Sequence, residues 1–117
     1  MGRRAGDGPG AWAAALELSV TRKLRAGYKK QGMTDAQIDV ALKGVIHFNT
    51  RVNKLMQQAT GQSVLGIDNK LYGLVLIHRD QYRHGIAHAD VEPSPGDATV
   101  AINDFEALRK VIDAIPV

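Results

Sequence analysis

Apolar side chains recur at every fourth position over the first part of the chain. They are Trp12, Leu16, Val20, Leu24 and Tyr28. This spacing places them on one face of an α-helix, because positions four apart lie nearly above one another. The pattern predicts a first helix from Ala11 to near Gly32. Residues 1–10 hold four Gly and one Pro without such a pattern, so we expect a poorly ordered arm there.

A capping box at Thr34 indicates the start of a second helix. The Thr34 hydroxyl can accept a hydrogen bond from the backbone N–H of Gln37, and the Gln37 side chain can accept one from the Thr34 N–H. Met33 and Ile38 have the spacing of the hydrophobic staple that often accompanies such a start. A helix is therefore predicted to begin at Thr34.

The same pattern predicts that this second helix runs without a break to about Thr60, where Gly61 closes it. Asn49 is the single polar residue on its inward face, and we expect it to be a hydrogen-bonded core amide or to lie at an interface edge. The inward face consists of Ile38, Leu42, Val45, Ile46, Asn49, Val52 and Met56.

A third helix is predicted to open between Ser63 and Asp68. Its inward face consists of Leu71, Leu74, Val75, His78 and Tyr82. Residues 91–97 contain two Pro and one Gly, which predicts a loop because proline restricts its own backbone and that of the residue before it.

A short β-prone stretch, Thr99 to Ile102, precedes the last predicted helix. That helix is expected to begin at Asn103, with Glu106 in the reciprocal capping position, and to end at Pro116. Its inward residues are Phe105, Leu108, Val111, Ile112 and Ile115.

Four amphipathic helices predict an all-α fold, an antiparallel helical bundle of about four helices in one domain over residues 11–117. The composition agrees, since the 117 residues are 44% hydrophobic but only 5% aromatic. The sequence has no cysteine, which excludes disulfides, thiolate metal sites and cysteine nucleophiles. No run of residues approaches the length of a membrane span, and we expect a soluble cytoplasmic protein without a membrane partner.

Charge is distributed unevenly along the chain. Residues 1–30 hold seven Lys and Arg against two acids, whereas residues 80–117 hold three against seven acids. Arg22, Arg25 and Lys29 share a face of the first helix that differs from its apolar face. This basic strip is interpreted either as a solvated surface or as a surface that follows a nucleic-acid backbone.

Chemistry-bearing side chains concentrate in residues 78–90, which hold three of the four His, two Arg and two Asp. His84 and His88 lie four positions apart, as two metal ligands on one helix face do. However, Gly85 stands where the hydrolytic zinc motif requires Glu, and we predict no metal and no cofactor. No serine has the context of a nucleophile elbow, and no phosphate-binding glycine loop is present.

The string Arg83-His84-Gly85-Ile86-Ala87-His88 resembles the signature of the HEPN superfamily, which comprises small helical-bundle ribonucleases. The likeness covers about residues 65–117 together with the general order of helices. It implies metal-independent cleavage of RNA through attack by the RNA's own 2′-hydroxyl. By resemblance, His88 is the general acid or base, Arg83 holds the phosphate, and His84 assists in binding or orienting the phosphate. Arg79 and Asp90 are further candidate supporting residues: Asp90 either orients His88 or is a solvated carboxylate. It also implies a bacterial toxin or a component of antiviral defence, with RNA as substrate and an antitoxin or defence complex as partner.

Arg83 and His88 do not share a face of a straight helix, because positions five apart differ by about 140° around its axis. They can converge if Gly85 loosens the helix, or if two chains form a two-fold homodimer with a composite cleft. One branch of the family has a tyrosine at the position of Asp90 that an antitoxin modifies, and this regulation is not expected here.

Two other functions stay open from the sequence. The first is a non-catalytic helical module of the same kind that binds a partner protein, a nucleotide or a nucleic acid. The second is a nucleic-acid binder that uses the basic strip Arg22, Arg25 and Lys29.

Overall fold

The computed structural model of the protein describes the backbone of residues 9–85 and 95–117, and the side-chain surroundings of residues 11–80 and 99–117. Over these ranges the secondary structure is helical, without a strand, which confirms the all-α prediction for this part of the chain. The elements are α1 (Pro9–Lys30), α2 (Asp35–Lys43), α3 (Phe48–Thr50), the π-helical segment η1 (Arg51–Leu55), α4 (Met56–Thr60), α5 (Val64–Ile67), α6 (Asn69–Gly85) and α7 (Pro95–Asp113). The second and third of the four predicted helices are therefore divided further, and Pro9 and Gly10 of the predicted arm belong to α1.

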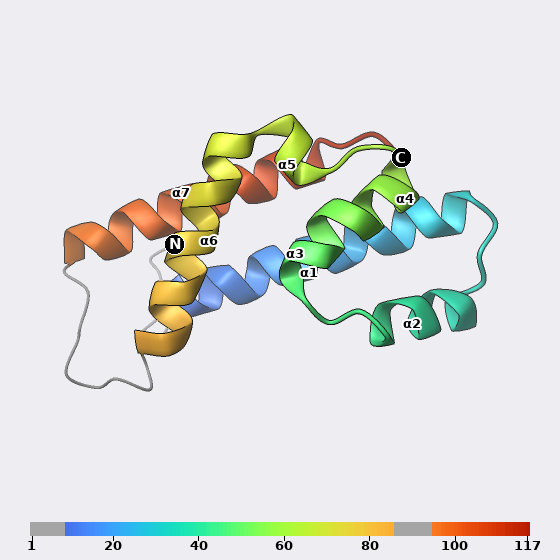
Figure 1. The fold of residues 1–117 in the computed structure, drawn as a ribbon, viewed down its shortest axis with the longest axis horizontal. Helices are drawn as coiled ribbons and strands as arrows, with labels where there is room; N and C mark the ends of the chain where they lie inside the picture. The colour runs from blue at the N-terminus through green and yellow to red at the C-terminus, as the bar shows by residue number, and fades with distance from the viewer. Residues whose placement is uncertain (1–8, 86–94) are drawn as a thin grey trace, which may run out of the picture.

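Helix α1 is the central element, and α7, α4, α2 and α6 all pack against it (Figure 1). Its predicted apolar face is confirmed, since Leu16, Val20 and Leu24 are completely or almost completely buried. Facing residues of α7, including Phe105 and Leu108, are buried with them in one hydrophobic core. Figure 1 shows α6 and α2 toward opposite ends of the long axis of the molecule.

Helices α1 and α4 approach each other closely at Gly27. A Cβ atom at this position would lie 2.5 Å from the carbonyl oxygen of Ala59 and 2.9 Å from its Cβ. Only the missing side chain of glycine allows the two backbones to come this near. Gly27 therefore fixes the position of the helical stretch 48–60 on α1.

The capping box at Thr34 is confirmed. The Gln37 N–H donates to Thr34 Oγ1 at 3.2 Å, and the Thr34 N–H donates to Gln37 Oε1 at 2.9 Å. The helix that starts here, however, ends at Lys43, so the prediction of one helix to Thr60 is wrong. The chain resumes a helix only at Phe48, and Gly61 closes that second part with φ +88°, as expected for a glycine after a helix.

Arg51 explains where α2 ends. Its Nε donates to the carbonyl oxygen of Val45 at 2.6 Å, and its Nη2 donates to that of Leu42 at 2.8 Å. The Leu42 carbonyl oxygen also accepts from the Val45 N–H at 3.2 Å, so the guanidinium adds a second donor at the last turn of α2. Its contact with Val45 stabilises the turn at residues 44–47 that replaces a continued helix.

The break changes which residues face the core. Ile46 is 74% exposed and Asn49 is also exposed, so their assignment to an inward face is wrong. The hydrogen-bonded amide lies one turn later, at Asn53 in η1. Asn53 Nδ2 donates to the Tyr72 hydroxyl at 3.0 Å, and its Oδ1 accepts from the Leu65 N–H at 3.0 Å. Asn53 thereby connects η1 to α5 and α6.

The third predicted helix is also divided. Ser63 caps α5 by accepting from the Gly66 N–H at 3.0 Å, and α6 starts separately, with Asp68 accepting from the Leu71 N–H at 3.0 Å. Leu74, expected on the inward face of this helix, is exposed.

The last helix is longer than predicted. Helix α7 begins at Pro95, so residues 95–97 are helical instead of a loop, while residues 91–94 lie outside the described residues. The β-prone stretch Thr99 to Ile102 is helical too, because burial of Ala101 and Ile102 outweighs its weak β-propensity.

The helix ends at Asp113, before Pro116. Lys23 Nζ donates to the carbonyl oxygens of Asp113 and Ile115, at 3.0 and 2.8 Å.

Within the described part of the chain, no helix combines the length and apolar character needed to cross a membrane.

The close approach of α1 and α4 can be tested with a matched pair of glycine variants. Gly27→Ala is expected to lower the free energy of unfolding by roughly 1–3 kcal/mol, because the new Cβ collides with backbone atoms of Ala59. Gly73→Ala lies in α6 with no atom within 4 Å of the new Cβ, and is expected to raise it by roughly 0.5–1 kcal/mol through helix propensity. Urea denaturation of both variants measures this. Equal stabilisation by both would contradict the close contact.

Candidate functional site

The HEPN-like motif begins in the last described turn of α6. The backbone of Arg83 and His84 is helical, since α6 is described to Gly85. The side chains of Arg83 and His84, and all of His88 and Asp90, lie outside the described residues. The convergence of Arg83 and His88 and the composite cleft of a homodimer therefore stay predictions.

Arg79, one turn before Arg83, is held between three elements. Its Nη2 donates to Glu17 Oε1 at 2.5 Å, which connects α6 to α1. Its guanidinium carbon lies over the Phe48 ring, 3.9 Å from the ring centroid, an arrangement that favours a cation on an aromatic face. The Arg79 side chain is only 15% exposed. Arg79 therefore has a fixed position beside the motif.

His78 connects α6 to α7. Its Nε2 lies 2.7 Å from Asp104 Oδ2, and the side chains of both residues are mostly buried. The His78 ring also meets the Phe105 ring edge-on, with centroids 6.0 Å apart. The sequence placed His78 on an inward face but did not indicate its partner, which is 26 residues away.

A cavity of about 320 Å³ opens beside Arg79. Its lining residues come from α6 and from the start of the helical stretch 48–60: His47, Phe48, Asn49, Leu76, Arg79 and Asp80. A neighbouring cavity of about 260 Å³ is lined by Glu17, Val20, Ile46, Phe48 and Arg51. The two cavities share Phe48 and flank the ion pair between Arg79 and Glu17.

His47 and Asn49 were not predicted as site residues. Asn49 was expected to be a hydrogen-bonded core amide or to lie at an interface edge. A signal was present, because Lys43 followed by Gly44 is a typical end of a helix. That signal would have placed His47 in a connection and turned Asn49 away from the core.

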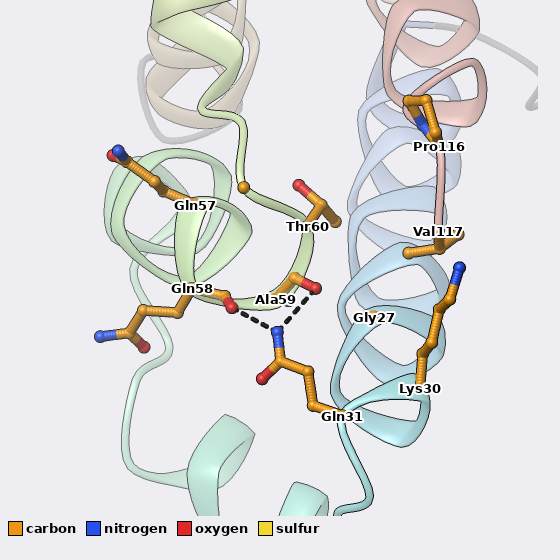
Figure 2. Close-up of a pocket in the computed structure, with 10 residues that line it drawn as sticks. Gly27, Lys30, Gln31, Gln57, Gln58, Ala59, Thr60, Pro116 and Val117 are labelled. Carbon is orange, nitrogen blue, oxygen red and sulfur yellow. Dashed lines mark hydrogen bonds between the residues drawn. The ribbon is translucent and has the colours of Figure 1, made fainter.

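A larger cavity, about 510 Å³, lies at the other end of α1 and is lined by residues of α1, α4 and their neighbours: Gly27, Lys30, Gln31, Gln57, Gln58, Ala59, Thr60, Gly61, Pro116 and Val117 (Figure 2). Gln31 Nε2 donates there to the carbonyl oxygens of Gln58 and Ala59, at 2.6 and 3.1 Å. Below this surface, burial raises the pKa of the Tyr28 phenol. The lining contains no imidazole or carboxylate side chain, so it offers little acid–base chemistry near neutral pH.

The basic strip on α1 faces acidic residues of α2. Arg25 forms an ion pair with Asp39, and Lys29 Nζ lies 3.6 Å from Asp35 Oδ1. Arg22 is exposed. Much of the positive charge that suggested a nucleic-acid surface is therefore balanced by α2.

Among the residues whose side chains are described, no three His, Asp or Glu form a group that could hold a metal ion. Scans against protein-family models, curated proteins and solved structures find no match for the chain. The candidate site is therefore defined by the motif of α6 and by the cavity beside Arg79.

The contact between His78 and Asp104 predicts a loss of stability when its acceptor is removed. Asp104→Ala leaves the mostly buried His78 ring without this partner, and we expect the free energy of unfolding to fall by roughly 1–3 kcal/mol. Arg109→Ala is the control, because Arg109 makes only more exposed ion pairs on α7, which contribute roughly 0–1 kcal/mol. Urea denaturation of both variants checks this, and an equal loss would contradict the assignment.

Proposed function

We propose that the protein is a metal-independent endoribonuclease in which Arg83 holds the scissile phosphate and His88 transfers a proton. The observation that carries this proposal is the sequence motif from Arg83 to His88, which begins in the last turn of the amphipathic helix α6, in a chain that is all-α over its described residues. A role as a bacterial toxin or in antiviral defence, with an antitoxin or defence-complex partner, follows from the same resemblance.

The chemistry needs only RNA and these side chains. The 2′-hydroxyl loses its proton to a base as its oxygen bonds to the adjacent phosphorus, and the bond from phosphorus to the 5′-oxygen breaks. The 5′-oxygen takes a proton, so the products are a 2′,3′-cyclic phosphate and a 5′-hydroxyl. Imidazole titrates near neutral pH and suits either proton transfer. The guanidinium of Arg83 stays charged and fits the phosphate oxygens as negative charge builds up.

The packing of α6 supports this proposal. The contact between His78 and Asp104 fixes α6 to α7, and the contacts of Arg79 with Glu17 and Phe48 fix it to α1 and α3. Catalytic groups need a rigid support of this kind to keep their geometry.

The exposed side of α6 supports a homodimer. Leu74 and Ile77, three residues apart on one side of this helix, are 38% and 63% exposed. Apolar side chains in this arrangement suit packing against a second helix. The composite cleft proposed for Arg83 and His88 needs a second copy near this end of α6.

A non-catalytic binding module is the second candidate function. The cavity beside Arg79 favours it, because four polar side chains line that cavity: His47, Asn49, Arg79 and Asp80. Such a module would bind RNA or a nucleotide and leave it intact.

Cleavage of a labelled single-stranded RNA in the presence of chelator tests the proposal. We expect the parent to produce the cyclic phosphate, and Arg83→Ala and His88→Ala each to lower the rate by roughly 10²–10⁴-fold. Arg22→Ala is the matched control, since Arg22 is an exposed arginine on a different side of α1 from Glu17, about 140° away around the helix axis, and its rate is expected to equal that of the parent. Unchanged cutting by both motif variants, or loss of cutting with chelator, would overturn the proposal.

A further inference from the structure

We propose that the cavity beside Arg79 seats one base of single-stranded RNA, next to the phosphate that Arg83 holds. This inference rests on the proposed endoribonuclease function and identifies its substrate-binding surface. The cavity volume of about 320 Å³ is at the lower end of the range for small-molecule sites. It accommodates a single nucleotide and excludes a duplex.

The position of the cavity along α6 fits this role. Arg79 and Leu76 line it from α6, and residue 83 follows them by one and two helical turns. Its backbone position therefore lies on the same side of α6, about 6 Å beyond Arg79 toward the end of the helix. An RNA strand with one phosphate at Arg83 thus brings an adjacent nucleotide to the cavity.

Arg79 supplies a surface on which a base can stack. Its guanidinium is backed by the Phe48 ring at 3.9 Å and held by Glu17, so it is positioned before a ligand arrives. Unpaired bases in RNA complexes stack on arginine guanidinium groups and on aromatic rings. Leu76 adds apolar area on the same side.

The charges at the cavity favour a base over a phosphate. Asp80 lines it beside Arg79, and Glu17 pairs with Arg79. The ion pair with Glu17 lowers the attraction of this guanidinium for an anion, and a further carboxylate in the lining lowers it more. A neutral base carries both N–H donors and acceptors, which the Asn49 amide and the His47 imidazole can match. The phosphate is then left to Arg83.

The same features identify the substrate as unpaired RNA. Bases in a duplex are stacked and paired, so their faces cannot reach a cavity of this size. His47 and Asn49 are exposed and therefore accessible to a strand that passes along this side of α6.

Binding is tested with a short single-stranded RNA that carries 2′-O-methyl groups throughout, so that it cannot be cut, and one fluorescent aminopurine base. Fluorescence anisotropy gives the Kd, and quenching of the aminopurine reports stacking. The double variant His47→Ala/Asn49→Ala is expected to raise the Kd about tenfold and to weaken the quenching. Both side chains are exposed, so the variant should fold, which its helical circular dichroism checks.

The matched control is Lys30→Ala/Gln57→Ala in the larger cavity at the other end of α1 (Figure 2). It also removes two polar side chains and, in addition, a positive charge. We expect its Kd to stay within about twofold of the parent value, because general charge attraction contributes little at this distance. A control that weakens binding as much as His47→Ala/Asn49→Ala would overturn the inference.

Cleavage of unmodified RNA separates this inference from the proposed function. The His47→Ala/Asn49→Ala variant should raise KM and leave kcat nearly unchanged, since the lost contacts bind substrate in the ground state and in the transition state alike. If the parent cuts RNA and this variant shows the parent Kd and KM, the base site is overturned and the endoribonuclease proposal stands. If the parent does not cut RNA while the variant loses binding, the nuclease proposal fails and the base site stands.

Discussion

The guanidinium of Arg51 determines how the chain passes from α2 to the helical stretch 48–60. It donates to the carbonyl oxygen of Leu42 in α2 and to that of Val45 in the turn that follows, and its Nη1 also donates to Thr21 Oγ1 of α1 at 3.3 Å. Hydrogen bonds from a charged donor contribute roughly 1.5–3 kcal/mol each when they replace contacts with water. One side chain thus joins α1, α2 and η1. It stabilises the turn at residues 44–47, which ends at the exposed His47 and leads into α3 with the exposed Asn49.

The candidate site depends on this turn as well as on α6. The motif that begins in α6 supplies groups that suit phosphate chemistry, whereas the end of the turn after α2 supplies the His47 imidazole and α3 supplies the Asn49 amide. Arg79 lies where the two meet, with Phe48 beneath it and Glu17 at its side. Arg79 is therefore held rigidly, while the neighbouring His47 and Asn49 are exposed to solvent. Binding of a flexible ligand benefits from groups that are both fixed in position and accessible.

Local patterns predicted the features that depend on neighbouring residues. The apolar face of α1, the capping box at Thr34 and the glycine at 61 were readable because each involves residues within one or two helical turns. The break after Lys43 was missed because the stabilising contacts come from Arg51, and the hydrophobic spacing continues across the break. The helical state of residues 99–102 was missed because it depends on burial against other helices, which overrides weak local preference.

The candidate site, like the fold, was predictable only where it depends on residues close in the sequence. The high density of His, Arg and Asp in residues 78–90 marked the segment that begins in α6 as the one with reactive groups, and Arg79 was predicted there as a supporting residue. Its contacts with Glu17 and Phe48 join residues 62 and 31 positions apart. The spacing of hydrophobic residues along the chain gives no information about such distant pairs. His47 and Asn49 were missed although Lys43 followed by Gly44 is a typical helix end, because the hydrophobic spacing continues past it.

The π-helical segment η1 bears on how relatives of this chain could differ in length. A π-helical turn contains one residue more than an α-helical turn, so removal of a single residue from Arg51–Leu55 would restore a regular helix. Because the wider turn absorbs the additional residue, the parts before and after the deletion would keep nearly the same register, and Phe48 would stay beneath Arg79. A homologue with a one-residue gap at this place would therefore keep both its core and the surface that this stretch presents to α6.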